Sequence, residues 1–211
     1  DLLTRCGGFL AYLWPHSVPH LTDMEKLCHE HPDWLALVNG KRRMGSTPLH
    51  TNFCTTDPAV IEFTVRLLSD AFKAQPEVEL LPVGPGDGTG FCECDRCRAL
   101  DTGGSWMYLG HAYPILSDRW LTFVNAVAEK LAISHPDKKI YTLAYHQTLT
   151  PPAKVRPRET VMIMVVNSIW TKISSKKSSD LVSSTFSLLM LIWCFAASVL
   201  RISCRLAAAR D

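Results

Sequence analysis

The end of this sequence lacks three residue types that the rest uses freely. None of the 11 glycines, 13 prolines or 8 histidines of the 211-residue chain lies after Pro157. Glycine and proline are the main signals for turns and loops, so residues 158–211 do not continue the loop-rich pattern that precedes them. This change indicates two unlike segments that meet near Asn167.

The sequence also lacks a strong charge of either sign. Residues 1–167 carry 16 Lys and Arg against 18 Asp and Glu, and residues 168–211 carry 6 against 2. The formal net charge of +2 therefore belongs to the tail, and nucleic acid is not an expected partner. The chain starts at Asp1, without Met and without a signal-peptide pattern, so we expect a processed chain or a fragment.

Hydrophobic spacing predicts alternating strands and helices up to Val166. Asp57-Pro58 and Ser117 are typical helix starts, and Asn39-Gly40 is a strong turn signal. Strands are predicted at 49–54, 78–83, 140–145 and 161–166. Such alternation predicts the α/β class with parallel strands. A complete (β/α)₈ barrel of about 250 residues would not quite fit in the chain.

In parallel sheets, ligands bind beyond the carboxyl ends of the strands. Six polar or thiol side chains follow predicted strands, and we expect them to lie at this edge: Asn52, Cys54, Asp87, Tyr145, His146 and Asn167.

Four stretches carry a family resemblance: HPDWLAL (31–37) with Gly40-Lys41-Arg42, FCTTDP (53–58), GDGTGFCECDRCRALD (86–101) and SDRWLTFVN (117–125). From about Gly8 to about Val166 the chain resembles the domain of unknown function 4838 family. That bacterial family is common in carbohydrate-degrading settings and is grouped with TIM-barrel glycoside hydrolases such as alpha-glucuronidases and hexosaminidases. The resemblance implies a barrel fold and action on glycans.

Asp87 is the candidate catalytic residue. Its glycine-rich loop follows a buried strand, where a carboxylate can protonate a glycosidic oxygen or hold a sugar hydroxyl. Hydrolysis usually needs a second carboxyl group, and Glu93, between two cysteines, is expected to point elsewhere. The alternative is that Asp87 is a turn residue that accepts a hydrogen bond from its own backbone. Asn52, Tyr145, His146 and Asn167 are the candidate substrate-binding residues.

Cys92, Cys94 and Cys97 place three thiols within six residues. A closed tetrahedral zinc site needs a fourth ligand, and Cys54 supplies it if the two strands are neighbours. A structural Cys₄ zinc site is the leading interpretation. A disulfide between two of the cysteines, or free thiols, are the alternatives.

Two further sets of residues have a structural and a functional interpretation. Trp14, Trp106, Tyr108 and Tyr113 are candidates for stacking on sugar rings, although core packing explains aromatic residues more often. Lys41-Arg42-Arg43 is interpreted as a solvated loop, because three charges are too few for a nucleic-acid site.

Residues 181–200 contain no charge, glycine or proline, and 15 of the 20 are apolar. This length suffices to cross a bilayer. A single membrane anchor, a tail foreign to the family and a buried helix are the three interpretations.

The combined hypothesis is a truncated TIM-type β/α barrel at 1–167, followed by a linker at 168–180, a hydrophobic helix at 181–200 and a basic tail at 201–211. The expected function is a glycoside-hydrolase-like domain that acts on or binds carbohydrate, outside the cytoplasm or at a membrane. The alternative is a non-catalytic carbohydrate-binding or membrane-tethered module.

Overall fold

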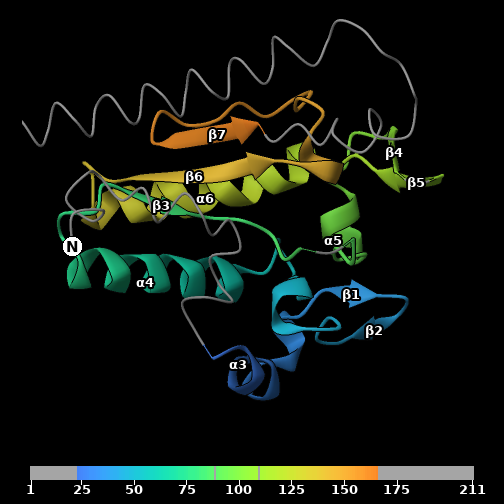
Figure 1. Ribbon diagram of the computed structural model, residues 1–211, viewed down its shortest axis with the longest axis horizontal. Helices are drawn as coiled ribbons and strands as arrows, with labels where there is room; N and C mark the ends of the chain where they lie inside the picture. Colours follow the sequence, from blue (N-terminus) through green and yellow to red (C-terminus); the bar gives the residue numbers. More distant parts are fainter. Residues whose placement is uncertain (1–22, 88, 109, 166–211) are drawn as a thin grey trace, which may run out of the picture. The chain divides into compact units, whose positions relative to one another are not determined.

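A parallel sheet of three strands organises the computed structural model, which describes residues 23–87, 89–108 and 110–165. The strands are β3 (Leu80–Pro82), β6 (Lys139–Ala144) and β7 (Val161–Val165), in the order β3-β6-β7 (Figure 1). Leu81 pairs with Ile140, which pairs with Val161. The predicted α/β class with parallel strands is confirmed, but the described residues form no closed barrel.

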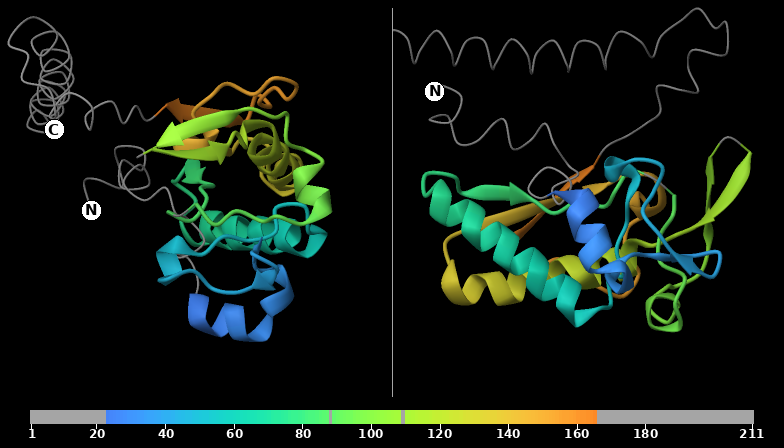
Figure 2. Two further views of the ribbon diagram at one scale, coloured as in Figure 1. Left: turned by 90° about the vertical axis from the view of Figure 1, so that its right-hand side faces the viewer. Right: turned by 90° about the horizontal axis from the view of Figure 1, so that it is seen from below.

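Two long helices cover the sheet, as their sequence spacing predicts. The helix α4 (Pro58–Ala74) begins where expected, because the Asp57 carboxylate accepts a hydrogen bond from the N–H of Ala59 at 2.9 Å. The helix α6 (Ser117–Ser134) packs against α4 and against β6 and β7 (Figure 2). Val124 and Val127 of α6 are completely buried in the shared core.

The start of α6 differs from the prediction, because Ser117 is the first helical residue and not the N-cap. Two buried charged side chains fix this end of the helix. Asp118 accepts hydrogen bonds from the N–H groups of Ala153, Lys154 and Val155 and from the Thr102 hydroxyl. The next residue, Arg119, forms an ion pair with Asp101 and donates to the Cys92 carbonyl oxygen at 2.6 Å.

The strand predicted at 49–54 is wrong for most of its length. A 3₁₀ helix occupies Pro48–His50, and a single antiparallel bridge joins Phe53 to Leu35. Backbone hydrogen bonds join this segment to residues 34–36: the N–H of Ala36 donates to the Asn52 carbonyl, and the N–H of Cys54 donates to the Trp34 carbonyl. Residues 51–54 are nevertheless extended and lie next to the loop that follows β3, where Gly86 donates to the Asn52 side chain at 2.9 Å.

Two hairpins flank the sheet. The first joins β1 (Leu37–Val38) to β2 (Lys41–Arg42) through Asn39 and Gly40, both at positive φ, as the turn signal predicts. The second, which we did not predict, joins β4 (Ser105–Tyr108) to β5 (His111–Pro114) and projects from the body (Figure 2). Short helices complete the described chain: α3 (Met24–Glu30), α5 (Asp95–Arg98) and 3₁₀ turns at Pro32–Trp34 and His146–Thr148.

Several predictions concern residues outside the described ranges. Trp14, Asn167, the linker at 168–180, the hydrophobic segment at 181–200 and the basic tail at 201–211 all lie there. Within the described ranges, no helix combines the length and the apolar character needed to cross a membrane.

Candidate functional site

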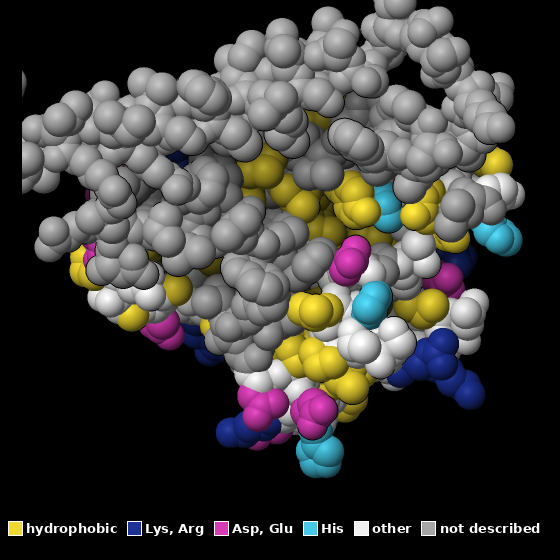
Figure 3. Space-filling view, in the orientation of Figure 1, with side chains coloured by type: hydrophobic (Ala, Val, Ile, Leu, Met, Phe, Trp, Pro, Cys, Tyr) yellow, Lys and Arg dark blue, Asp and Glu magenta, His cyan; other side chains and the backbone are white. Residues whose placement is uncertain are grey.

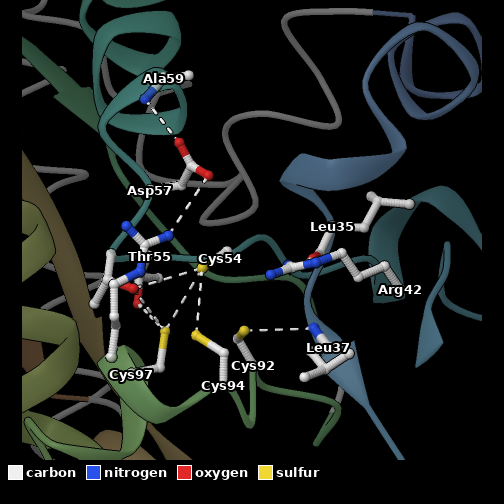
Figure 4. A network of polar contacts seen from close by, with 12 residues as sticks. Leu35, Leu37, Arg42, Cys54, Thr55, Asp57, Ala59, Cys92, Cys94 and Cys97 are labelled. Atoms are coloured by element: carbon white, nitrogen blue, oxygen red, sulfur yellow. Dashed lines mark hydrogen bonds and ion pairs between the residues drawn. The ribbon is translucent and has the colours of Figure 1, made fainter. Parts of the chain in front are cut away.

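The four predicted metal ligands come together. The sulfur atoms of Cys54, Cys92, Cys94 and Cys97 all lie within 4.8 Å of one another (Figure 4). Cys54 is the last residue of the extended segment 51–54, and the other three come from the loop and the short helix α5 that follow β3. The Cys54 sulfur is 3.7 Å from that of Cys94 and 3.8 Å from that of Cys97.

These distances fit a tetrahedral metal site. Four sulfurs at a zinc–sulfur distance of about 2.3 Å are separated by about 3.8 Å from one another. The separations exceed the about 2.05 Å of an S–S bond, and none of the five cysteines in the described ranges forms a disulfide. Cys54, Cys92 and Cys97 are buried, which is typical of a closed structural site.

Hydrogen bonds within the cluster favour negative charge on the Cys54 sulfur. Hydrogen bonds from the Cys92 and Cys97 thiols, with a further contribution from Thr56, hold the pKa of the Cys54 thiol below its ordinary value. The backbone N–H of Leu37 donates to the Cys92 sulfur at 3.4 Å. The same hydrogen bonds with Cys54 raise the pKa of the Cys92 and Cys97 thiols, so a bound cation would have to displace their protons.

Arg42 also reaches this cluster, and the sequence interpretation missed it. We interpreted Lys41-Arg42-Arg43 as a solvated loop, but only Lys41 and Arg43 are exposed. The Arg42 guanidinium points toward the cysteines (Figure 4) and donates a hydrogen bond to the Leu35 carbonyl oxygen. Burial would lower the pKa of Arg42, but the neighbouring thiols of Cys54, Cys92 and Cys94 raise it. No local motif announces this contact, because it joins residues on separate loops.

A second group of candidate residues meets at the carboxyl end of the sheet. Asp87, Tyr145 and His146 line one pocket, together with residues that follow β3 and β6. Figure 3 shows hydrophobic and histidine side chains with an acidic side chain at the right-hand end, where the strands of the sheet end. The rule that polar groups converge beyond parallel strands therefore holds for these three residues.

Aromatic rings form one side of this second site. The His146 ring stacks on Tyr145, with 3.7 Å between ring centroids, and on Trp106 at 4.9 Å. Trp106 stacks in turn on Tyr108 at 5.1 Å. Trp106 and Tyr108 alternate along β4 and so share one face, while Met107 between them is 61% exposed. Neither ring belongs to the buried core of the described residues.

The electrostatics of the pocket depend on Asp87. Burial raises the pKa of the Tyr145 phenol, and the Asp87 charge raises it further. Burial lowers the pKa of His146, against the opposing effect of Asp87. His146 is therefore neutral at pH 7 and can donate from one ring nitrogen and accept at the other. Its φ of 50° is a left-handed backbone conformation, which is uncommon for a residue other than glycine.

Asn52 lies beside this pocket but has a structural contact. Its side-chain oxygen accepts the hydrogen bond from Gly86, while its buried Nδ2 has no hydrogen-bond partner among the described residues. Asn52 therefore holds the loop that carries Asp87. Glu93 points away, as expected: it accepts from the N–H of Asn39 and pairs with Arg98.

The comparison with protein families gives one match. A family model described as "Domain of unknown function (DUF4838)" matches residues 5–193. The matched range runs past Val166, where the resemblance seen in the sequence stopped, so residues 167–193 also lie within it. No curated protein and no solved structure matches the chain.

Proposed function

Since the chain belongs to the family of domain of unknown function DUF4838, its own residues must indicate its activity, and we propose that it binds carbohydrate at the carboxyl end of its parallel sheet. The observation that carries this proposal is the row of stacked rings beside the Asp87 carboxylate. Flat aromatic faces suit the apolar faces of sugar rings, and a carboxylate accepts hydrogen bonds from sugar hydroxyls.

We further propose that the described residues are part of a TIM-type β/α barrel of the glycoside-hydrolase kind. Such barrels repeat a parallel strand followed by a helix on the outer face. The described residues contain three parallel strands with helices packed on one face. The extended segment 51–54, which is joined to the loop after β3 by the hydrogen bond from Gly86 to Asn52, would correspond to one more strand of the barrel. In this fold the pocket of Asp87, Tyr145 and His146 lies at the end where barrel enzymes bind substrate.

Asp87 would act as the general acid or base of glycoside hydrolysis, or as an anchor for a sugar hydroxyl. Hydrolysis usually needs two carboxyl groups about 5–9.5 Å apart. Among the described residues that line the pocket, Asp87 is the one carboxylate. This favours sugar binding by the described residues, and hydrolysis would require a second carboxylate from elsewhere. A non-catalytic carbohydrate-binding or membrane-tethered module is the second candidate function.

We also propose that the four cysteines hold a structural zinc ion. Zinc bound by four thiolates has no open position for a substrate, so its contribution is mechanical. It would join Cys54, at the end of segment 51–54, to Cys92, Cys94 and Cys97, which follow the Asp87 loop directly. The zinc ion would then hold together the two segments next to Asp87, namely segment 51–54 and the cysteine loop that follows Asp87.

The experiment that tests the sugar site is a binding titration with oligosaccharides that contain hexosamine, uronic acid or neutral hexose units. We expect the wild-type chain to bind at least one class, and Trp106→Ala to weaken that binding about tenfold, since each 1.4 kcal/mol corresponds to a factor of ten. The control is Met107→Ala, the neighbouring exposed position on the opposite face of β4. Absence of binding to every class, or equal binding by the Trp106 variant, would contradict the proposal.

A further inference from the structure

The β1–β2 hairpin places one of its three consecutive basic residues on the cysteine cluster. Arg42 pairs across the hairpin with Leu37, so their side chains lie on the same face. Leu37 packs against the buried cysteines, and its N–H donates to the Cys92 sulfur at 3.4 Å. Because side chains alternate between the two faces of a strand, Lys41 and Arg43 face solvent while Arg42 faces the sulfurs.

The charge of a Cys₄ centre explains why a cation would be useful at this position. Four thiolates and one divalent ion leave a net charge of −2, and such a charge is costly in a largely buried site unless it is paired. Arg96 and Arg98, the arginines of α5, pair with the carboxylates of Asp57 and Glu93. Within the described part of the chain, no ion pair joins Arg42 to a carboxylate; its guanidinium donates to the Leu35 carbonyl and points toward the cysteine sulfurs.

We propose that Arg42 is a positioning residue of the metal centre, which balances the thiolate charge from outside the ligand shell and so raises the affinity for a thiophilic divalent ion. This inference rests on the proposed Cys₄ zinc centre. The hairpin contributes to the cluster through the Arg42 guanidinium, which points toward the sulfurs, and through the Leu37 N–H, which donates to the Cys92 sulfur. Outer-shell partners of this kind typically account for about 10- to 100-fold in metal affinity.

The geometry also explains why arginine suits the position better than lysine. The planar guanidinium donates to the Leu35 carbonyl and has further N–H groups on the side that points toward the cysteines. A lysine ammonium carries the same charge but lacks this planar fork. Arg42→Lys should therefore keep part of the effect, whereas Arg42→Gln should lose the charge and most of the effect.

The experiment is a zinc competition titration of the full chain against a chelator of known affinity. We expect Arg42→Gln to bind zinc about 10- to 100-fold more weakly than wild type, and Arg42→Lys to fall between the two. The control is Arg43→Gln, which removes the same charge from the exposed face of the hairpin and should bind zinc as wild type does. A second readout uses Co²⁺: at saturation, the thiolate-to-cobalt absorption of Arg42→Gln should equal that of wild type, because all four ligands remain.

Three results would overturn the role of Arg42. These are equal zinc affinity of wild type and Arg42→Gln, equal losses in the Arg42→Gln and Arg43→Gln variants, and a smaller cobalt absorption at saturation in Arg42→Gln, which would indicate a collapsed site. If Arg42→Gln does not fold, the zinc affinities of Arg42→Lys and Arg43→Gln are compared. Weaker binding by Arg42→Lys supports the role of Arg42, and equal binding contradicts it. A wild-type chain that binds no zinc would instead refute the metal centre itself.

Discussion

The carbonyl oxygen of Thr51 lies where a side chain on Gly86 would have to be. A Cβ atom at Gly86 would come within 2.3 Å of this oxygen, closer than any tolerated contact. The same close approach allows the N–H of Gly86 to donate to Asn52, and the N–H of Asp87 to donate to the Leu49 carbonyl at 2.7 Å. Glycine at this position therefore lets the loop that carries Asp87 rest against segment 49–52.

We expect Gly86→Ala to destabilise the protein by about 1–3 kcal/mol, the usual cost of forcing extra volume into a packed site, and to displace Asp87. Thermal unfolding and sugar binding measure the two effects. The matched control is Gly90→Ala in the same loop, where the added Cβ would make an ordinary 3.6 Å contact with Val38. Equal stability of the Gly86 and Gly90 variants would contradict this account of the loop.

A second prediction concerns the metal. We expect the purified chain to contain about one zinc ion, and Cys54→Ser to lose it, because one of four thiolate ligands is removed. Loss of the ion should also lower the melting temperature, since a ligand at 1,000 times its Kd stabilises the folded state by about 4 kcal/mol. Elemental analysis and thermal unfolding measure the two outcomes.

The control for this prediction is Cys28→Ser, because Cys28 lies on α3 and outside the cluster. It should leave the metal content unchanged. Full zinc content in the Cys54 variant would rule out Cys54 as a ligand. Absence of zinc from the wild type, together with fewer titratable thiols than cysteines, would favour the disulfide alternative.

The sequence was informative where a signal is local. Asp57-Pro58 and the apolar spacing of α4 predicted that helix, and Asn39-Gly40 predicted the first hairpin. The gathering of Cys54 with the later cysteines was predicted from the expected chain topology and is confirmed, although Cys54 ends a segment with a single bridge and not a strand paired with β3. The prediction that Cys54 meets these cysteines did not require knowledge of any contact between distant segments.

The sequence was uninformative where the outcome depends on contacts between distant segments. Residues 49–54 have the composition of a strand, but their backbone groups are taken by residues 34–36 and by the Asp87 loop. The role of Arg42 depends on which face of a two-residue strand meets a loop about fifty positions later. The β4–β5 hairpin is largely exposed, so it lacks the buried alternation that marks a strand in a sequence.

A third prediction concerns pH and stability at the start of α6. Burial alone would raise the pKa of Asp118, but hydrogen bonds from Ala153, Lys154 and Val155, and from Thr102, outweigh it and hold the pKa below its usual range. The carboxylate therefore contributes stability above about pH 4, the ordinary value in an unfolded chain, and this contribution is lost as the pH falls.

We expect Asp118→Asn to reduce the free energy of unfolding at pH 7 by about 2 kcal/mol, the range for hydrogen bonds to a charged group. The difference from wild type should shrink toward pH 3, because the unfolded chain takes up a proton at this residue below about pH 4. Urea unfolding at the two pH values measures this, with the exposed Asp137→Asn as control. A deficit that is the same at both pH values would show that the charge of Asp118 is not the cause.

The last prediction tests Asp87, whose carboxylate faces the pocket with Tyr145 and His146. Asp87→Asn keeps the size of the side chain but removes its charge and turns one acceptor into a donor. We expect sugar affinity to fall about tenfold, because hydrogen bonds to a charged group contribute about 1.5–3 kcal/mol. Any hydrolysis of hexosaminide or glucuronide substrates should be abolished, since an amide cannot transfer the proton.

Asp33→Asn is the matched control, because Asp33 is an exposed carboxylate outside this pocket. It should change neither binding nor hydrolysis. Reduced binding without any hydrolysis in the wild type would support the carbohydrate-binding module over the hydrolase. If Asp87→Asn changes neither binding nor hydrolysis, the carboxylate has no role at the site. Asp87 would then be a turn residue, as in the alternative interpretation, held by its backbone hydrogen bond to Leu49.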